Sequence, residues 1–318
     1  MIDFTKLTGI EHDGKVVTQI EDSNGRVLWA VKKGTKVVLT AKKATVTTNS
    51  GGVEYEGETF VAIDVYPTTN GVVKVTYNGR TKTITDTSGV AEPNSQTVYF
   101  GTMYGENDGT ELLDSGIVTI EGQFKEFGNG QYYKTGKGSL REIAYAGCID
   151  AVADWGDIVS IPDGGFNSSS FASITLPQGL RSIGAKAFGY CGNLSSFVVP
   201  EGIEEIKDNT FSECTNMTSL VLPSTLKKIG ENVAFCNADG GRPMTINVLA
   251  TTPPEYTGTF DEDGIMGMSL LYGLTSNKGT YYITVPRGCL GAYQIAPGWS
   301  AYADITQYNK VIMKEVGT

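Results

Sequence analysis

Residues 174–191 read ITLPQGLRSIGAKAFGYC, residues 197–214 read FVVPEGIEEIKDNTFSEC, and residues 220–237 read LVLPSTLKKIGENVAFCN. These three segments begin 23 residues apart, and their prolines, Pro177, Pro200 and Pro223, keep the same spacing. A period of roughly 20 to 30 residues is typical of a solenoid, in which each coil buries its apolar face on the next. The sequence therefore predicts stacked coils, each with a short strand.

The same period predicts which strand residues face solvent. Alternate side chains of a strand point to opposite faces, so apolar Phe197 and Val199 point inward and Val198 points outward. Applied to every coil, this rule gives two exposed columns of short, mostly uncharged side chains: Thr175, Val198, Val221, Asn247 and Thr284, beside Ser173, Ser196, Ser219, Thr245 and Tyr282. We interpret the columns as a candidate binding surface, although strand propensity explains the same residues equally well.

A second face of the predicted coils is charged. Its two columns are Arg181, Glu204 and Lys227, and Ser182, Glu205 and Lys228. Because opposite charges one coil apart attract, we expect these columns to favour the correct register and not to bind a ligand. The periodic Cys191 and Cys214 are predicted to be buried, reduced side chains without a metal or redox role.

The repeat resembles the BspA-like leucine-rich repeat family over about residues 140–306. The family pattern of a strand ending in proline, a Leu-x-x-Ile-Gly step and an Ala-Phe-x-x-Cys step is matched at residues 174–177, 180–184 and 187–191. The sequence departs from it at Lys207, where the glycine is missing. Residues 282–302 are similar to the segment that ends many such arrays, which implies a short C-terminal capping helix. The resemblance implies a role in adhesion and recognition of surfaces.

The N-terminal half predicts a different, antiparallel architecture. Asn24-Gly25 lies between two β-prone runs, which indicates a hairpin. Further short runs at 36–47, 59–66, 72–77, 80–85, 97–102 and 116–121 are separated by turn residues, as in a small β-sandwich. The expected fold is thus mainly β, with a hairpin segment at 1–31, a sandwich at 32–137 and the solenoid with its cap at 138–318.

The N-terminal sequence also carries two resemblances of its own. Residues 1–9, 14–20 and 25–29 resemble the opening of tail- or baseplate-associated proteins of phages and prophages of Gram-positive bacteria. Residues 72–85 are similar to small PEGA-type or immunoglobulin-like domains. These resemblances imply a virion protein whose N-terminal region contacts other virion proteins. The runner-up hypothesis is a bacterial cell-surface adhesin.

Composition excludes several other classes of function. The formal net charge of −10 disfavours nucleic acid and anionic lipid as partners. No apolar run is long enough for a secretory signal or a membrane span, so no membrane insertion is expected. The single histidine, His12, removes multi-histidine metal sites and most nucleophile–histidine arrangements. Two acidic turns, 106–109 and 261–264, lack the spacing of a dedicated calcium loop and are predicted to be solvated.

Together these observations predict a non-enzymatic binding protein without a cofactor. Its expected ligand is a bacterial surface protein or glycan, bound through the solenoid, and its expected location is a phage tail or a cell surface. A carbohydrate hydrolase that uses a carboxylate pair is a less favoured alternative, because no pair of carboxylates stands out in the sequence.

Overall fold

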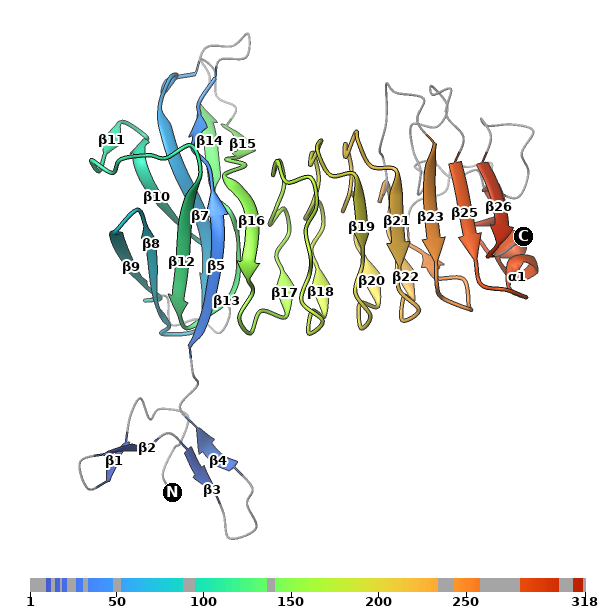
Figure 1. Ribbon diagram of the computed structural model, residues 1–318, viewed down its shortest axis with the longest axis horizontal. Helices are drawn as coiled ribbons and strands as arrows, with labels where there is room; N and C mark the ends of the chain where they lie inside the picture. Colours follow the sequence, from blue (N-terminus) through green and yellow to red (C-terminus); the bar gives the residue numbers. More distant parts are fainter. Residues whose placement is uncertain are drawn as a thin grey trace.

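The computed structural model describes residues 34–47, 53–87, 95–135, 141–233, 243–257, 281–302 and 311–316, and the backbone of four short strands before residue 31. Strands account for 44% of the fold and helix for 4%, so the prediction of a mainly β protein is confirmed. Figure 1 shows antiparallel sheets at one end and a row of stacked coils extending from them.

The antiparallel part contains two five-stranded sheets, neither of which closes on itself. The first has β11 (Glu106–Asn107), β10 (Gln96–Met103), β7 (Thr59–Pro67) and β13 (Phe124–Asn129) in this order, with β6 (Ala44–Thr45) also paired to β7. The second has the order β16 (Ile149–Asp154), β5 (Thr35–Ala41), β12 (Gly116–Gly122), β8 (Val72–Tyr77) and β9 (Arg80–Thr85).

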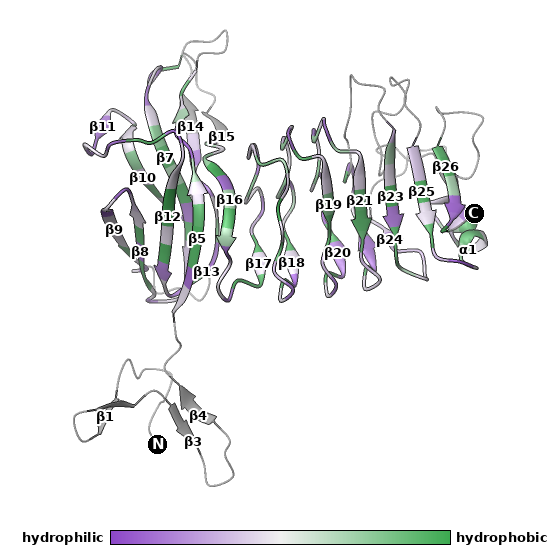
Figure 2. Ribbon diagram, viewed as in Figure 1, coloured by the Kyte–Doolittle hydropathy of each residue, from purple (hydrophilic) through white to green (hydrophobic). Residues whose placement is uncertain are grey.

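Alternation of apolar and polar residues explains how these sheets pack. In β8, Val73, Val75 and Tyr77 are buried, whereas Lys74 is exposed, as the sequence predicts. The ring of Tyr77 lies 5.5 Å from that of Phe100 on β10, so residues of the two sheets share one core. Figure 2 shows the resulting change between hydrophobic and hydrophilic residues along the strands.

Further strand pairs flank this part of the chain. β3 (Gln19–Glu21) pairs with β4 (Val27–Ala30), which confirms a hairpin across the segment that holds Asn24-Gly25. A second pair, β1 (Ile10–His12) with β2 (Lys15–Val17), precedes it and was not predicted. The antiparallel β14 (Gln131–Thr135) and β15 (Arg141–Tyr145) follow β13.

The strand β16 shows that the antiparallel sheets continue beyond residue 137. It pairs with β5, nearly 110 residues earlier in the chain, through partners such as Ile149 and Ala41. No turn signal or repeat in the sequence marks this long-range pairing. The second sheet therefore contains strands from both sides of the proposed domain boundary at 137/138. That boundary stays a prediction.

The repeat region forms two sets of parallel strands. The first, here called the long ladder, consists of β19 (Ser196–Val198), β21 (Ser219–Leu222), β23 (Met244–Val248), β25 (Tyr281–Val285) and β26 (Val311–Glu315). The second, the short ladder, consists of β17 (Ser160–Ile161), β18 (Ser182–Ile183), β20 (Glu205–Ile206), β22 (Lys228–Ile229) and β24 (Glu255–Tyr256). Parallel strands one coil apart are what the 23-residue period predicts.

Periodic aromatic rings hold successive coils together. Phe166, Phe188 and Phe211 stack almost parallel, with ring centroids 5.6 Å and 5.7 Å apart. Beside them the thiols of Cys191 and Cys214 are free, and each donates to a phenylalanine carbonyl of the preceding coil, at 3.2 Å and 3.1 Å. The two cysteines are therefore buried side chains, as predicted, and burial raises the pKa of Cys191.

The antiparallel part closes one end of this stack. Phe127 of β13 and Trp155 each lie 5.7 Å from the ring of Phe166. The buried Asn129 side chain donates to Asn167 O at 2.8 Å, and its Oδ1 accepts from the backbone N–H of Ile149. Apolar contacts and a satisfied buried amide thus join the first coil to the sheets.

The far end carries the predicted helix and an additional strand. Helix α1 (Leu290–Ile295) is followed by the 3₁₀ turn η2 (Ser300–Tyr302). Tyr293 and Trp299 are buried here and donate to the carbonyls of Ala250 and Pro254, both at 2.7 Å. The chain then adds β26 to the long ladder beside β25, so within the described residues the ladder ends on a strand.

The buried carboxyl group of Asp64, in the middle of β7, makes stability depend on pH. Burial raises its pKa to about 6 from an ordinary 3.8, although hydrogen bonds from Thr97 and the backbone of Gln131 oppose the shift. Because the folded state holds this proton more tightly than the unfolded chain, its contribution to the free energy of unfolding falls as the pH rises from about 4 to about 6, and is constant above.

We expect Asp64→Asn to remove this pH-dependent contribution to the free energy of unfolding. Relative to the variant, the wild type should gain about 2 kcal/mol between pH 7 and pH 4, because each pKa unit is worth about 1.36 kcal/mol and the full shift is reached only well below pH 3.8. Urea unfolding of both proteins at several pH values measures the difference. Parallel pH profiles for the two proteins would show that Asp64 is not the titrating group.

Candidate functional site

The long ladder brings most of the predicted surface residues into register. Val198 lies opposite Val221, Val221 opposite Asn247, and Asn247 opposite Thr284. Ser196, Ser219, Thr245 and Tyr282 form the neighbouring column in the same way. Ser173 and Thr175 lie in the preceding coil, outside any strand, and both are exposed. The structure therefore places eight of the ten residues in two continuous columns.

These columns are open to solvent at one end and partly closed at the other. Val198 is 64% exposed, Val221 and Asn247 are half-buried, and Thr284 is buried. The Thr284 hydroxyl donates to Asn247 Oδ1, so this hydroxyl and this amide oxygen are engaged with each other. The accessible part of the surface is consequently the end nearest the antiparallel sheets.

Sequence reasoning missed the last residues of both columns. Ile312 lies opposite Tyr282, and Lys314 lies opposite Thr284. The ammonium group of Lys314 is 5.5 Å from the centroid of the Tyr282 ring, a cation–π contact that links the two columns. No strand was predicted at residues 311–315, which lie 30 positions after their partners in β25.

The charged columns on the short ladder are only partly paired. Lys227 and Glu204 form the expected ion pair at 2.6 Å, and Lys228 lies opposite both Glu205 and Glu255. Arg181 instead donates to the carbonyl oxygen of Leu180 in its own turn, at 2.9 Å. Since Lys227 and Glu204 are largely exposed, their pair contributes roughly 0–1 kcal/mol to stability.

A gap interrupts the short ladder between β18 and β20. β17 pairs with β18, and β20, β22 and β24 form a separate sheet. On the flanking junctions Arg181 N donates to Val159 O at 2.7 Å and Lys227 N to Glu204 O at 2.8 Å. No equivalent backbone hydrogen bond joins Glu204 N to the coil before it, within the described stretch 141–233. The two coils are therefore less tightly joined along this face.

Lys207, the residue where the sequence departs from the repeat, explains the gap. Gly184 and Gly230 occupy the same position in the neighbouring coils, and each approaches the preceding coil closely. A Cβ on Gly184 would lie 2.3 Å from Asp163 N, and one on Gly230 would lie 2.3 Å from Asp208 Oδ1. Such distances exclude a side chain, so a coil with lysine at this position cannot approach as closely.

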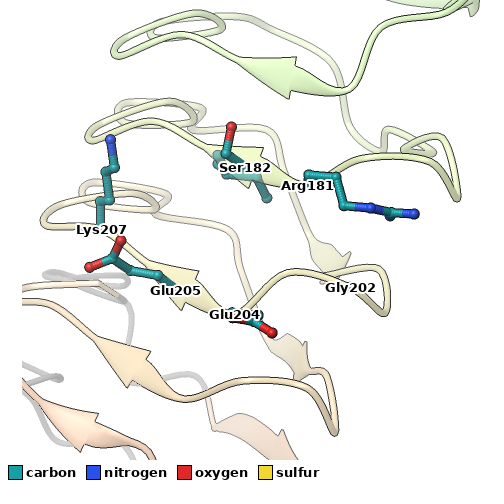
Figure 3. Close-up of a pocket in the computed structure, with 7 residues that line it drawn as sticks. Arg181, Ser182, Gly202, Glu204, Glu205 and Lys207 are labelled. Atoms are coloured by element: carbon teal, nitrogen blue, oxygen red, sulfur yellow. The ribbon is translucent and has the colours of Figure 1, made fainter.

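The same junction also lacks a carboxylate that joins the other coils. Asp163 accepts a hydrogen bond from Ala185 N, and Asp208 accepts one from Glu231 N, both at 2.8 Å. Ala185 occupies the equivalent position in the coil between these two, and its side chain has no hydrogen-bond acceptor. A pocket of about 580 Å³ opens here, lined by Ile183 and by six residues that Figure 3 labels on the two coils: Arg181, Ser182, Gly202, Glu204, Glu205 and Lys207.

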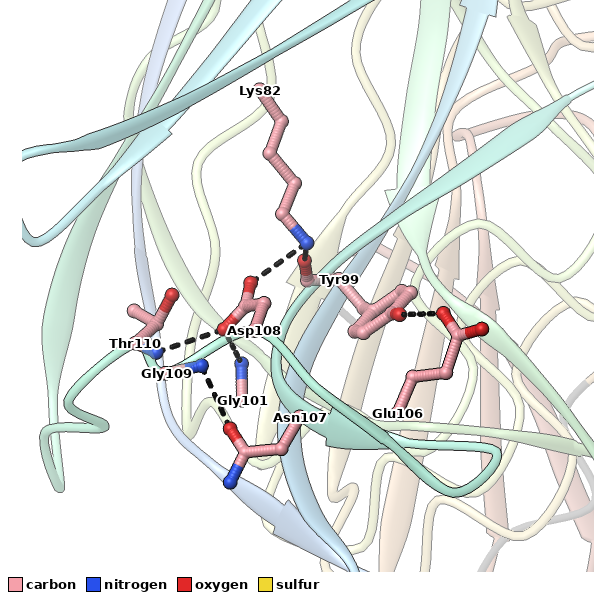
Figure 4. A network of polar contacts seen from close by, with 8 residues as sticks. All are labelled: Lys82, Tyr99, Gly101, Glu106, Asn107, Asp108, Gly109 and Thr110. Carbon is pink, nitrogen blue, oxygen red and sulfur yellow. Dashed lines mark hydrogen bonds and ion pairs between the residues drawn. The ribbon is translucent and has the colours of Figure 1, made fainter.

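The acidic turn at 106–109 is built around an internal ion pair. The ammonium group of Lys82 lies 2.7 Å from Asp108 Oδ2, and Asp108 Oδ1 accepts from Gly101 N and Thr110 N (Figure 4). Partial burial alone would raise the pKa of Asp108, but these donors hold it below its ordinary value. The expectation of a solvated turn is thus wrong for Asp108, because Lys82 of β9 reaches it from the other sheet. The turn at 261–264 lies outside the described residues.

The described part of the chain holds no group of three or more His, Cys, Asp or Glu side chains placed to bind a metal ion. Its helices are too short or too polar to cross a bilayer.

We expect Lys207→Gly to let the two coils close. Backbone hydrogen bonds should then form between β18 and β20 and stabilise this junction by about 1 kcal/mol. The amides at 204–207 should therefore exchange their hydrogens about fivefold more slowly. Lys228→Gly, in the paired part of the same ladder, is the control and should not slow exchange there. Unchanged exchange at 204–207 in Lys207→Gly would show that the lysine does not hold the coils apart.

The repeat geometry agrees with a comparison to known families. Residues 156–247 match the model of the BspA type leucine rich repeat region, in six copies. No curated protein matches the chain. The match does not extend to the antiparallel part, and it lends no support to the phage-tail or immunoglobulin-like resemblances. The chain thus carries BspA-type leucine-rich repeats between residues 156 and 247, a type of repeat that indicates protein binding or adhesion.

Proposed function

We propose that this chain is a non-enzymatic adhesion protein that recognises a bacterial surface protein or glycan through the open end of the long ladder. The observation that carries the proposal is the in-register surface of Ser196 and Val198 with Ser219 and Val221, which Ser173 and Thr175 extend toward the sheets.

The chemistry of this surface supports a binding role. Its side chains are short and uncharged, so a partner can approach the parallel strands closely without desolvating an ion. The prominently exposed Val198 offers apolar contact, and the serine and threonine hydroxyls offer both donors and acceptors. Recognition here depends on shape and hydrogen bonding more than on charge.

For the biological setting we propose a phage or prophage tail, with the N-terminal region joined to other virion proteins. The resemblance of residues 1–9, 14–20 and 25–29 to tail-associated proteins supports this setting. A bacterial surface adhesin is the alternative, and proteins with BspA-like repeats are often surface-associated. The hypothesis of a carbohydrate hydrolase remains a prediction that no observation tests.

Binding of the labelled full chain to intact Gram-positive cells tests the proposal. We expect Val198→Glu to reduce binding at least tenfold, because a charge at the centre of an apolar contact costs about 1.4 kcal/mol or more. Ile117→Glu is a matched control, since Ile117 is also β-branched, lies on a strand and is 63% exposed against 64% for Val198. Thermal unfolding of both variants checks that they fold.

Loss of binding in Val198→Glu alone would support the long ladder as the recognition surface. Equal binding by the wild type and both variants would contradict the proposal, as would the absence of binding across a broad panel of cells.

A further inference from the structure

A column of three aromatic rings runs from the core of the antiparallel part to its surface. Phe60 and Tyr132 are buried, and their rings stack 5.5 Å apart. Tyr104 stacks on Tyr132 at 5.0 Å with an interplanar angle of 7°, and Tyr104 is 38% exposed. Tyr55 stands nearly perpendicular to Tyr104, at 5.9 Å and 82°. Together Tyr104 and Tyr55 form a corner that rests on a rigid base.

The backbone at Tyr104 is unfavourable for tyrosine. Tyr104 and Gly105 form the two-residue loop between β10 and β11, with φ values of 55° and 80°. A two-residue hairpin loop with positive φ at both positions is a type I′ turn, which favours Asn-Gly. A bulky residue at positive φ is a conformational outlier with an energetic cost.

The chain itself supplies the comparison. The hairpin between β8 and β9 has the same loop length and the same signs of φ, and it uses Asn78 and Gly79, with φ values of 44° and 75°. Tyrosine therefore replaces the locally favoured asparagine in one of two equivalent turns. Residues that break a local rule are commonly found where function requires them.

Glu58 compensates for part of this cost. Its carboxylate accepts hydrogen bonds from the backbone N–H groups of both Tyr104 and Gly105, the first at 2.8 Å. Hydrogen bonds to an ionised acceptor are stronger than neutral ones and hold the turn in place. The exposed ring is consequently fixed from below by Tyr132 and from behind by Glu58.

We propose that Tyr104, stacked on Tyr132 and flanked by Tyr55, is a platform that binds one pyranose ring of a neutral glycan. The face of an aromatic ring carries negative partial charge and attracts the partly positive C–H groups of a sugar face. The two tyrosine hydroxyls can exchange hydrogen bonds with sugar hydroxyls. Burial raises the pKa of the Tyr132 hydroxyl, and the negative charges of Glu58 and Glu54 raise it further, so the site is electronegative and disfavours an anionic ligand.

This platform belongs to the antiparallel part and is independent of the long ladder. The two sites are therefore tested with different variants, Tyr104→Asn for the platform and Val198→Glu for the long ladder. The two proposals can then fail separately.

Saturation-transfer NMR of the full chain tests the platform with neutral hexasaccharides of glucose, galactose, mannose and N-acetylglucosamine. We expect at least one of them to bind at millimolar concentration. Tyr104→Asn should weaken that binding about tenfold and leave the thermal midpoint unchanged or higher, because asparagine suits the turn. Tyr190→Asn is the matched control, since Tyr190 also has positive φ, 59°, and is 59% exposed, but lies in the repeat region.

Three results would overturn the proposal. The first is that none of the hexasaccharides binds. The second is that binding is equally strong in Tyr104→Asn. The third is that decaproline, a neutral peptide that also stacks on aromatic rings, binds through Tyr104 while the sugars do not, which would assign the platform to a peptide.

Discussion

The stack of Phe166, Phe188 and Phe211 is the interaction on which the repeat region depends. A coil of this kind cannot bury its apolar face alone, so each ring is shielded only by its neighbours. The first coil therefore needs a cover, which Phe127 and Trp155 supply from the antiparallel part. Deleting a ring of this size from a core typically costs about 3–5 kcal/mol, and here the loss would also expose the next coil.

The buried Asn129 makes this cover specific. Apolar rings alone tolerate small rotations, whereas a buried amide is stable only when its hydrogen bonds are satisfied in one arrangement. Asn129 joins the sheets to Asn167, Ser169 and Ile149, which lie on both sides of the junction. The antiparallel part thus caps the first coil of the repeat region in one defined orientation.

Departures from local rules mark the two most distinctive features of the molecule. Lys207 stands where glycine allows the neighbouring coils to approach, and a gap follows in the short ladder. Tyr104 stands where asparagine would suit the turn, and an exposed ring follows. In both cases the chain holds the locally favoured residue at an equivalent position, Gly184 and Gly230 for Lys207 and Asn78 for Tyr104. The structural effect of each departure can therefore be compared within a single chain.

Three ion pairs lie away from the open end of the long ladder. Lys36 pairs with Glu121, Lys82 with Asp108 and Lys227 with Glu204. The open end of the long ladder carries no ionisable side chain among Ser173, Thr175, Ser196 and Val198. A ligand bound there makes its direct contacts with uncharged groups, so no ion of this surface has to be desolvated.

The sequence by itself determined the register of the long ladder from β19 to β25 and the strands between residues 35 and 122, because both are written in local patterns. The 23-residue period aligns Val198 with Val221, and alternation assigns Val73 and Val75 to the core. Only the tertiary structure decided that β16 joins β5, that β26 extends the ladder to Lys314, and that Tyr55, Tyr104 and Tyr132 meet. These contacts join residues from 28 to more than 100 positions apart without a common period. They arise because buried surfaces must be covered, a requirement that no short stretch of sequence records.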